Sequence, residues 1–133
     1  MFTYETSVKL HNTDAAGLLF FADQFKLAHD AYELFMESIG FSFRHILQES
    51  DFLLAIVHAE ADFLQALYSG DKLTIKLSVD KIGTTSFTLA YDLTMAQRGS
   101  VGTARTVHVC IDKTSREKKS LPDSLVAELS KHT

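Results

Sequence analysis

The feature that most limits the fold of this chain is a single change in the spacing of its apolar residues. Residues 18–39 repeat apolar side chains every three or four positions, which predicts one long helix that ends at Gly40. The other long runs alternate with period two, as half-buried strands do, and they cover residues 2–10, 52–66, 72–81, 86–96 and 101–112. A short amphipathic helix follows Pro122. Strands joined by short turns after one helix predict an α+β fold with an antiparallel sheet on one side of the helix.

The predicted burial pattern indicates that copies of the chain pack together. The long helix is expected to bury one face, made of Phe21, Phe25, Ala28, Tyr32, Phe35, Met36 and Ile39. Strict alternation along residues 52–66 separates two sets of side chains, which are Val57, Ala59, Ala61 and Phe63 on one face and Ile56, His58, Glu60, Asp62 and Leu64 on the other. One helix covers only one face of the sheet, so we expect the apolar residues of the outer face to contact another copy. The sequence therefore predicts a homo-oligomer.

The composition is that of a globular protein with one domain, over residues 1–133. Its length matches the usual size of one domain, and 46% hydrophobic residues exclude intrinsic disorder. The 13 basic and 17 acidic residues form no basic block, which argues against nucleic acid as a partner. No apolar run approaches the roughly 18 residues of a membrane span, and the first residues lack a signal-peptide pattern. Cys110 is the only cysteine, so no internal disulfide forms, and we expect a buried thiol and a soluble, cytoplasmic protein.

The segment from His11 to Phe21 has the strongest chemical character in the sequence. Asp14 lies in a turn between the first strand and the mainly apolar helix, and Gly17 can adopt a positive φ there. Unpaired backbone N–H groups at a helix start can polarise a carbonyl, and a nearby carboxylate can attack that carbonyl or activate water. The residues alone leave a second role open, in which Asp14 only shapes the loop through an Asx turn or a helix cap.

This segment resembles the signature of the 4-hydroxybenzoyl-CoA thioesterase branch of the hot-dog superfamily, in which Asp-x-Asp-x-x-Gly precedes hydrophobic and aromatic residues. The resemblance covers essentially the whole chain and continues through residues 29–33, 57–63, 70–73, 83–87 and 106–112. Within the branch, the chain is most similar to thioesterases that act on 1,4-dihydroxy-2-naphthoyl-CoA in phylloquinone and menaquinone synthesis. The resemblance implies a long central helix wrapped by a five-stranded antiparallel sheet, hydrolysis of an aromatic acyl-CoA to the free acid and CoA, and a tetramer built from two dimers.

The resemblance also implies roles for the loop residues. Asp14 would be the nucleophile, or the general base that activates water. The backbone N–H of Phe21, expected at the helix start, would hold the thioester oxygen, while Gly17 shapes the turn. One such donor is worth roughly 3 kcal/mol of the barrier. No metal or redox cofactor is expected, because a thioester is already activated for acyl transfer.

Substrate binding is expected to involve five further residues. His29, about two helical turns past Phe21, would meet a hydroxyl of the acyl ring, and Phe25 would set the depth of the pocket. Thr85 and Ser86 would line the pantetheine channel. His58 is included among the substrate-binding candidates.

Two positions depart from the family pattern. Asn12 stands where the family has its first Asp, and this change is expected to cost little because the catalytic position falls on Asp14. The turn at residues 83–86 lacks the cations that bind the CoA phosphates in some relatives. Lys81 is the nearest cation to this turn. The contact with the CoA nucleotide is therefore expected to be weaker, or to come from other basic residues of this chain or of a neighbouring subunit, which are Lys113, Arg116, Lys118 and Lys119.

Other groups of residues support weaker hypotheses. His58, Glu60 and Asp62 would spread over about 13 Å of strand, too far to close around one metal ion, and His108 with Cys110 lacks further metal ligands. Another thioesterase branch uses a carboxylate on the helix, a part that Glu33 or Asp30 could play here. Alternative substrates are 4-hydroxybenzoyl-CoA or a range of short-chain acyl-CoAs. A non-catalytic acyl-CoA-binding module is the alternative from another class, and the presence of Asp14 argues against it.

Overall fold

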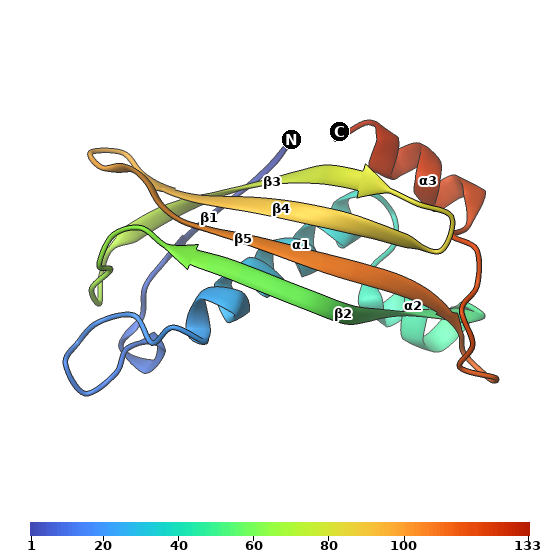
Figure 1. Cartoon of the computed structure of the whole chain (residues 1–133), viewed down its shortest axis with the longest axis horizontal. Coiled ribbons are helices and arrows are strands. Elements are labelled where there is room, and N and C mark those ends of the chain that lie inside the picture. Colours follow the sequence, from blue (N-terminus) through green and yellow to red (C-terminus); the bar gives the residue numbers. More distant parts are fainter.

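A five-stranded sheet curves around one long helix, as Figure 1 shows. The computed structural model describes all 133 residues. The strands pair in the order β1-β3-β4-β5-β2, and every pair is antiparallel. The elements are β1 (Phe2–Ser7), the 3-10 helix η1 (Leu10–Asn12), α1 (Asp23–Ser38), α2 (Phe43–Glu49), β2 (Phe52–Phe63), β3 (Lys72–Ile82), β4 (Ser86–Met95), β5 (Gly99–Asp112) and α3 (Asp123–Ser130). The predicted α+β fold with a hot-dog arrangement is confirmed.

Helix α1 is shorter than predicted at its beginning. It starts at Asp23, and residues 18–22 form a loop instead of the expected first helical turns. Phe21 is consequently 62% exposed, so its prediction as a core residue is wrong. The buried face of α1 adds Gln24, Leu27 and Ala31 to the predicted residues. The spacing of apolar residues misled the prediction here because this loop is itself apolar.

The end of α1 follows the sequence signal closely. Gly40 adopts a φ of +89° and lies just past the helix. Its N–H donates to the carbonyl of Glu37 over 3.1 Å, and the N–H of Phe41 donates to Met36 over 2.9 Å. These two bonds form a Schellman motif, which satisfies carbonyls that the helix end leaves free.

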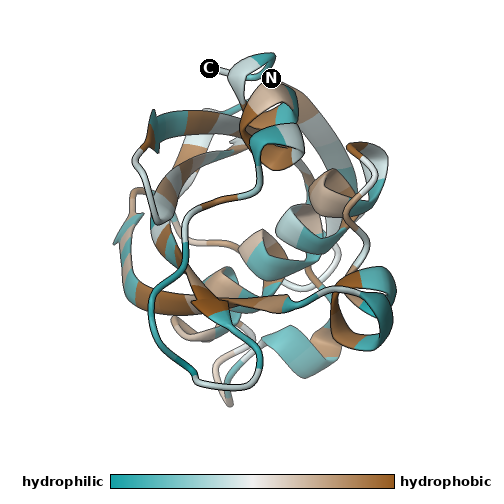
Figure 2. Ribbon diagram, turned by 90° about the vertical axis from the view of Figure 1, so that its right-hand side faces the viewer, coloured by the Kyte–Doolittle hydropathy of each residue, from teal (hydrophilic) through white to brown (hydrophobic).

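Strands β3 and β4 supply most of the core against α1. Leu73, Ile75, Leu77 and Val79 of β3 are buried. The matching face of β4, made of Phe87, Leu89, Tyr91 and Leu93, is also buried, so the alternation predicted for both strands is confirmed. Figure 2 shows the resulting mixture of hydrophobic and hydrophilic segments along the strands and α1. Leu125 and Leu129 of α3 close the core near the end of β3, where the N–H of Val79 donates to His132.

The first strand is also shorter than predicted. It ends at Ser7, and the chain turns into η1, which leaves Leu10 77% exposed. The alternation of residues 2–10 therefore describes a strand only over its first six residues.

None of the helices combines the length with the apolar character that a membrane crossing requires.

A β-bulge at Val57 changes which residues of β2 share a face. Ile56 pairs with His108 and His58 pairs with Val107, so Val57 is an extra residue without its own partner. The prediction of strict alternation along residues 52–66 is therefore wrong at Val57, where the bulge shifts the pattern by one residue. Ile56 lies on the helix side of the sheet with Ala59, while His58 lies on the outer side beside Glu60.

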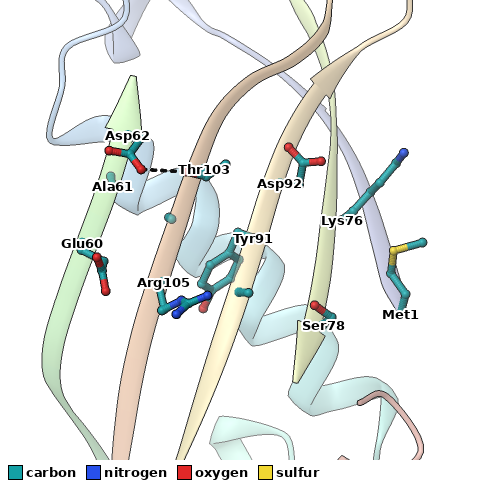
Figure 3. A pocket seen from close by; sticks show the side chains of 12 residues that line it. Met1, Glu60, Ala61, Asp62, Lys76, Ser78, Tyr91, Asp92, Thr103 and Arg105 are labelled. Carbon is teal, nitrogen blue, oxygen red and sulfur yellow. Dashed lines mark hydrogen bonds between the residues drawn. The ribbon is translucent and has the colours of Figure 1, made fainter. Parts of the chain in front are cut away.

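The outer face of the sheet is polar rather than apolar. Figure 3 shows Glu60, Lys76, Asp92 and Arg105 on this face, around a hollow of about 420 Å³. The prediction of an apolar outer face is therefore wrong for the central strands. Six of the exposed large apolar residues lie along or just after β2 and on the loop before α1, and they are Ile56, Val57, Phe63, Leu64, Phe20 and Phe21.

Candidate active site

Asn12 holds the loop before α1 against the start of that helix. Its side chain is buried, its Oδ1 accepts the N–H of Lys9 over 2.9 Å, and its Nδ2 donates to Oδ2 of the buried Asp23 over 3.0 Å. Its backbone carbonyl accepts the N–H of Phe20 over 2.9 Å. Asn12 thus connects the loop to the start of α1, and the expectation that the change from Asp costs little stays a prediction. The donor that an amide supplies to Asp23 is one that an ionised aspartate at this position would lack.

Asp14 uses one carboxylate oxygen to shape the loop and leaves the other free. Its Oδ1 accepts the N–H groups of Ala16 over 2.8 Å and of Leu18 over 3.2 Å. Its backbone carbonyl accepts the N–H of Gly17 over 3.0 Å, and Gly17 has the expected positive φ of +80°. Oδ2 has no hydrogen-bond partner in the chain, and the residue is exposed. The Asx turn and a chemical role are therefore compatible, because they use different oxygens.

Two backbone donors lie free just before α1. The N–H groups of Asp23, Gln24 and Phe25 bond to carbonyls three residues earlier, so the first helical turn has no spare donors. The N–H groups of Phe21 and Ala22 donate to no acceptor in the chain. The donor expected at Phe21 is thus present, but on the loop rather than on the helix. Phe21 also borders a cavity of about 320 Å³ with Leu18, Phe63 and other residues that follow β2.

Gln24 fixes the beginning of α1 against the sheet. It is buried, and its Nε2 donates to the carbonyls of Asp62 over 3.1 Å and Thr103 over 2.9 Å. A Cβ at Gly102 would lie 2.9 Å from the amide of Gln24, so a larger residue there would displace this side chain. Sequence reasoning missed this contact, although a Gln on an apolar helix face and a Gly inside a strand were visible signals.

His29 and Phe25 lie together at a small cavity between α1 and the sheet. The cavity has a volume of about 90 Å³ and is lined by Phe25, His29, Ile56, Ala59, Tyr91 and Thr106. His29 Nδ1 lies 2.8 Å from Oε2 of Glu33, so this carboxylate orients the imidazole. In this structure the carboxylate of Glu33 therefore fixes the orientation of the His29 ring. His58 lies on the outer face of the sheet, 3.5 Å from Glu60, and not beside this cavity.

A chain of buried polar side chains lies beneath the same cavity. Tyr91 Oη is 2.8 Å from Thr106 Oγ1, which is 2.7 Å from His108 Nε2. The His108 ring stacks on Phe87 with centroids 4.9 Å apart and lies 4.2 Å from the ring of Tyr32. Burial lowers the pKa of His108 to about 3, and burial raises the pKa of Tyr91 to about 12. Both groups are therefore neutral at ordinary pH.

The sequence indicates His108 only as a weak metal ligand and does not predict this arrangement. Cys110 is a buried, free thiol whose pKa is raised by burial. The structure brings no three His, Cys, Asp or Glu side chains into a group that could hold a metal ion. The visible signal for the polar chain was the sequence Thr106-Val107-His108, in which two polar residues alternate onto the face of a buried strand.

Thr85 and Ser86 lie at the opposite end of the sheet from Asp14. Ser86 pairs with Val109, which pairs with Ala55 at the beginning of β2, whereas the loop before α1 lies beyond the end of β2 (Figure 1). The span of β2 from Ala55 to Phe63 is about 26 Å. One chain therefore does not bring all the predicted site residues together.

Two of the basic candidates near Thr85 are already paired within the chain. Lys113 donates to the carbonyls of Ile46 over 3.0 Å and Leu47 over 2.9 Å, at the end of α2. Lys119 contacts Asp51 over 2.8 Å, and this ion pair raises the pKa of Lys119. Arg116 and Lys118 are exposed and make no ion pair in the chain, which leaves them available to an external anion.

Comparison with known proteins provides independent evidence on this arrangement. Residues 8–129 match the family model described as the thioesterase-like superfamily. A 1,4-dihydroxy-2-naphthoyl-CoA hydrolase of Nostoc punctiforme is 41% identical over 125 residues, which cover 94% of this chain and 84% of that protein. A protein of the same name from Rippkaea orientalis is 35% identical, covering 92% of this chain and 91% of its own length.

A solved structure shows the same fold at similar sequence identity. The crystal structure of a 1,4-dihydroxy-2-naphthoyl-CoA thioesterase from Synechocystis superimposes with a TM-score of 0.90 at 33% identity. The match covers 97% of this chain and 95% of that one. A Staphylococcus aureus protein solved in complex with CoA reaches a TM-score of 0.91 at 19% identity, which shows a shared fold.

Proposed function

Because the chain belongs to the thioesterase-like superfamily and has its hot-dog fold, it is a thioester hydrolase, and we propose that its substrate is 1,4-dihydroxy-2-naphthoyl-CoA. The reaction adds water across the thioester bond and releases the aromatic acid and free CoA. Relatives that carry this substrate in their names match more than nine-tenths of the chain at 35–41% identity. The proposal thus concerns the acyl group and the residues that act on it.

The observation that carries the proposed mechanism is that one oxygen of the Asp14 carboxylate has no hydrogen-bond partner. Oδ1 accepts two backbone N–H groups and is held in place, while Oδ2 is unpartnered and exposed. A carboxylate fixed in this way can attack the thioester carbonyl or take a proton from the attacking water. The free N–H of Phe21 would then stabilise the negative charge that develops on the carbonyl oxygen.

We assign the cavity beside His29 to the aromatic ring of the acyl group. Its lining is mostly apolar, with a few polar groups that can fix orientation. When neutral, His29 donates from Nδ1 to Glu33 and keeps Nε2 as an acceptor for a ring hydroxyl. At about 90 Å³ the cavity holds only part of two fused rings, so the open side of the site must also contribute.

We propose that a second copy of the chain completes this open side. Strand β2 pairs only with β5, so its other edge is unpaired, and it carries exposed Ile56, Val57 and Phe63. Two β2 edges related by a two-fold axis would run antiparallel, which would bring the Thr85 end of one copy toward the Asp14 loop of the other. Pantetheine would then cross between copies, and two such dimers would form a tetramer.

The decisive experiment separates the structural role of Asp14 from its chemical role. In Asp14→Asn the amide oxygen can still accept the N–H groups of Ala16 and Leu18, so the loop is expected to keep its shape. Hydrolysis of 1,4-dihydroxy-2-naphthoyl-CoA, 4-hydroxybenzoyl-CoA and a short-chain acyl-CoA is followed by a thiol reporter. We expect the naphthoyl thioester to be the best substrate and the variant to lose roughly 10³-fold or more in kcat. Near-normal turnover by the variant would restrict Asp14 to the Asx turn.

A further inference from the structure

Tyr91, Thr106 and His108 form a row of three hydrogen-bonded polar side chains inside the core. All three residues are buried, yet Nδ1 of His108 has no hydrogen-bond partner. A buried polar group without a partner destabilises the folded state. Tyr91 and Thr106 also line the cavity beside His29. These three hydrogen-bonded side chains therefore connect an unpaired imidazole nitrogen deep in the core with the floor of the proposed acyl pocket.

The position of the single proton on the His108 imidazole decides whether Tyr91 or Thr106 has a free hydroxyl proton for the cavity. If the proton is on Nδ1, a buried N–H is left unpaired, Thr106 donates to Nε2, Tyr91 donates to Thr106, and no hydroxyl proton is left over. If the proton is on Nε2, that nitrogen donates to Thr106 Oγ1, and only one hydroxyl proton is needed between Thr106 and Tyr91. The second hydroxyl proton is then free. Unpaired buried N–H groups are rarer than under-satisfied acceptors, which favours the Nε2–H form.

We propose that the Tyr91–Thr106–His108 chain is a specificity element, which presents one hydroxyl donor to an oxygen atom on the aromatic ring of the acyl group. His108 is a positioning residue, because it sets the direction of the hydrogen bonds without touching the ligand. Stacking on Phe87 and the contact with Tyr32 hold its ring in place. The inference rests on the proposed function for the identity of the ligand, but it concerns recognition rather than hydrolysis.

The free hydroxyl donor of Tyr91 or Thr106 complements the acceptor nitrogen Nε2 of His29. Both groups lie on the same cavity, so an aromatic ring with hydroxyl substituents can accept one hydrogen bond and donate another. A ring without substituents would leave the donor unpaired in an apolar cavity. A site built to bond a hydroxyl discriminates more strongly than one that only excludes by size.

The first test measures binding of the product acid, so that it does not depend on turnover. Affinities for 1,4-dihydroxy-2-naphthoate and 2-naphthoate are measured by calorimetry for wild type, Tyr91→Phe, the double variant Tyr91→Phe/Thr106→Val, and the control Tyr32→Phe. Tyr32 contacts the same imidazole but lies outside the hydrogen-bonded chain. We expect Tyr91→Phe, or the double variant if Thr106 carries the free proton, to lose roughly tenfold in affinity for the dihydroxy acid. The loss for 2-naphthoate should be much smaller, and Tyr32→Phe should not alter the ratio of the two affinities.

The second test observes the proton directly. The ¹⁵N shifts of the His108 ring at neutral pH distinguish the two neutral forms, and we expect Nε2–H. An Nδ1–H form, or equal losses for the two acids in both Tyr91 variants, would overturn the inference. Failure of the proposed function would instead appear as absence of hydrolysis by wild type, with the binding difference and the tautomer unaffected.

Discussion

Replacing Asn12 by Asp would restore the first acidic residue of the family signature, and the structure predicts that this restoration is harmful. The amide of Asn12 donates to Asp23 over 3.0 Å, and both residues are about 5% exposed. In the variant, two carboxylates would face each other at that separation. Their repulsion would be about 5.5 kcal/mol at an effective dielectric constant of about 20. The folded pair can escape this cost by holding one proton between the two groups.

The cost of holding that proton depends on pH. Keeping a carboxyl with an ordinary pKa of about 3.9 protonated costs about 4 kcal/mol at pH 7 and about 1.5 kcal/mol at pH 5. Holding the proton costs less free energy than the repulsion between two ionised carboxylates. Asn12→Asp should therefore lose about 4 kcal/mol of unfolding free energy at pH 7. The proton is bound more tightly in the folded variant than in the unfolded one, so stability falls as pH rises. The protonated carboxyl donates to Asp23, so the hydrogen bond itself survives.

The matched control is Asn12→Ala, which removes the hydrogen bond without adding charge. It should cost about 1.5–3 kcal/mol at both pH values, because one partner of a buried carboxylate is lost. Urea unfolding of wild type and both variants at pH 5 and pH 7, at one protein concentration, provides the free energies. If the difference between Asn12→Asp and Asn12→Ala does not change with pH, the contact between Asn12 and Asp23 does not act as described.

Three further predictions concern selectivity, assembly and the end of α1. His29→Leu should lower kcat/KM roughly tenfold for hydroxylated aryl-CoAs and much less for benzoyl-CoA, and equal losses on one preparation would make His29 a packing residue. Val57→Asp, on the exposed edge of β2, should convert the oligomer to a species near 14.8 kDa in sedimentation, whereas Leu47→Asp, exposed on α2, should leave the assembly intact. A monomeric wild type would refute the proposed pairing. Gly40→Ala should cost about 1 kcal/mol in thermal unfolding, because φ at that position is +89°.

The order and type of the five strands, of α1 and of α3 could be predicted from the sequence because each depends on local spacing, whereas η1 and α2 were not predicted. The alternation along β3 and β4 put the right residues into the core, and Gly40 ended α1 where expected. Gly17 likewise marked the turn at Asp14, since a positive φ is a local requirement that few other residues meet.

Element boundaries and faces were decided by contacts between distant segments. The first turns predicted for α1 are replaced by a loop, because Asn12 binds both Phe20 and Asp23 there. The bulge at Val57 moves Ile56 onto the same face as Ala59, and it is defined by the pairing with β5, so no pattern within β2 alone reveals it.

The site divides in the same way. The residues themselves pointed to Asp14, and the family resemblance added Phe21, Phe25 and His29 as expected site residues. The tertiary structure alone decided that Thr106 and His108 of β5 meet Tyr91 of β4 beneath His29, and that Thr85 lies at the far end of the sheet. Strand pairing brings together residues that are far apart in the chain, and the register of that pairing is a property of the whole sheet rather than of any one segment.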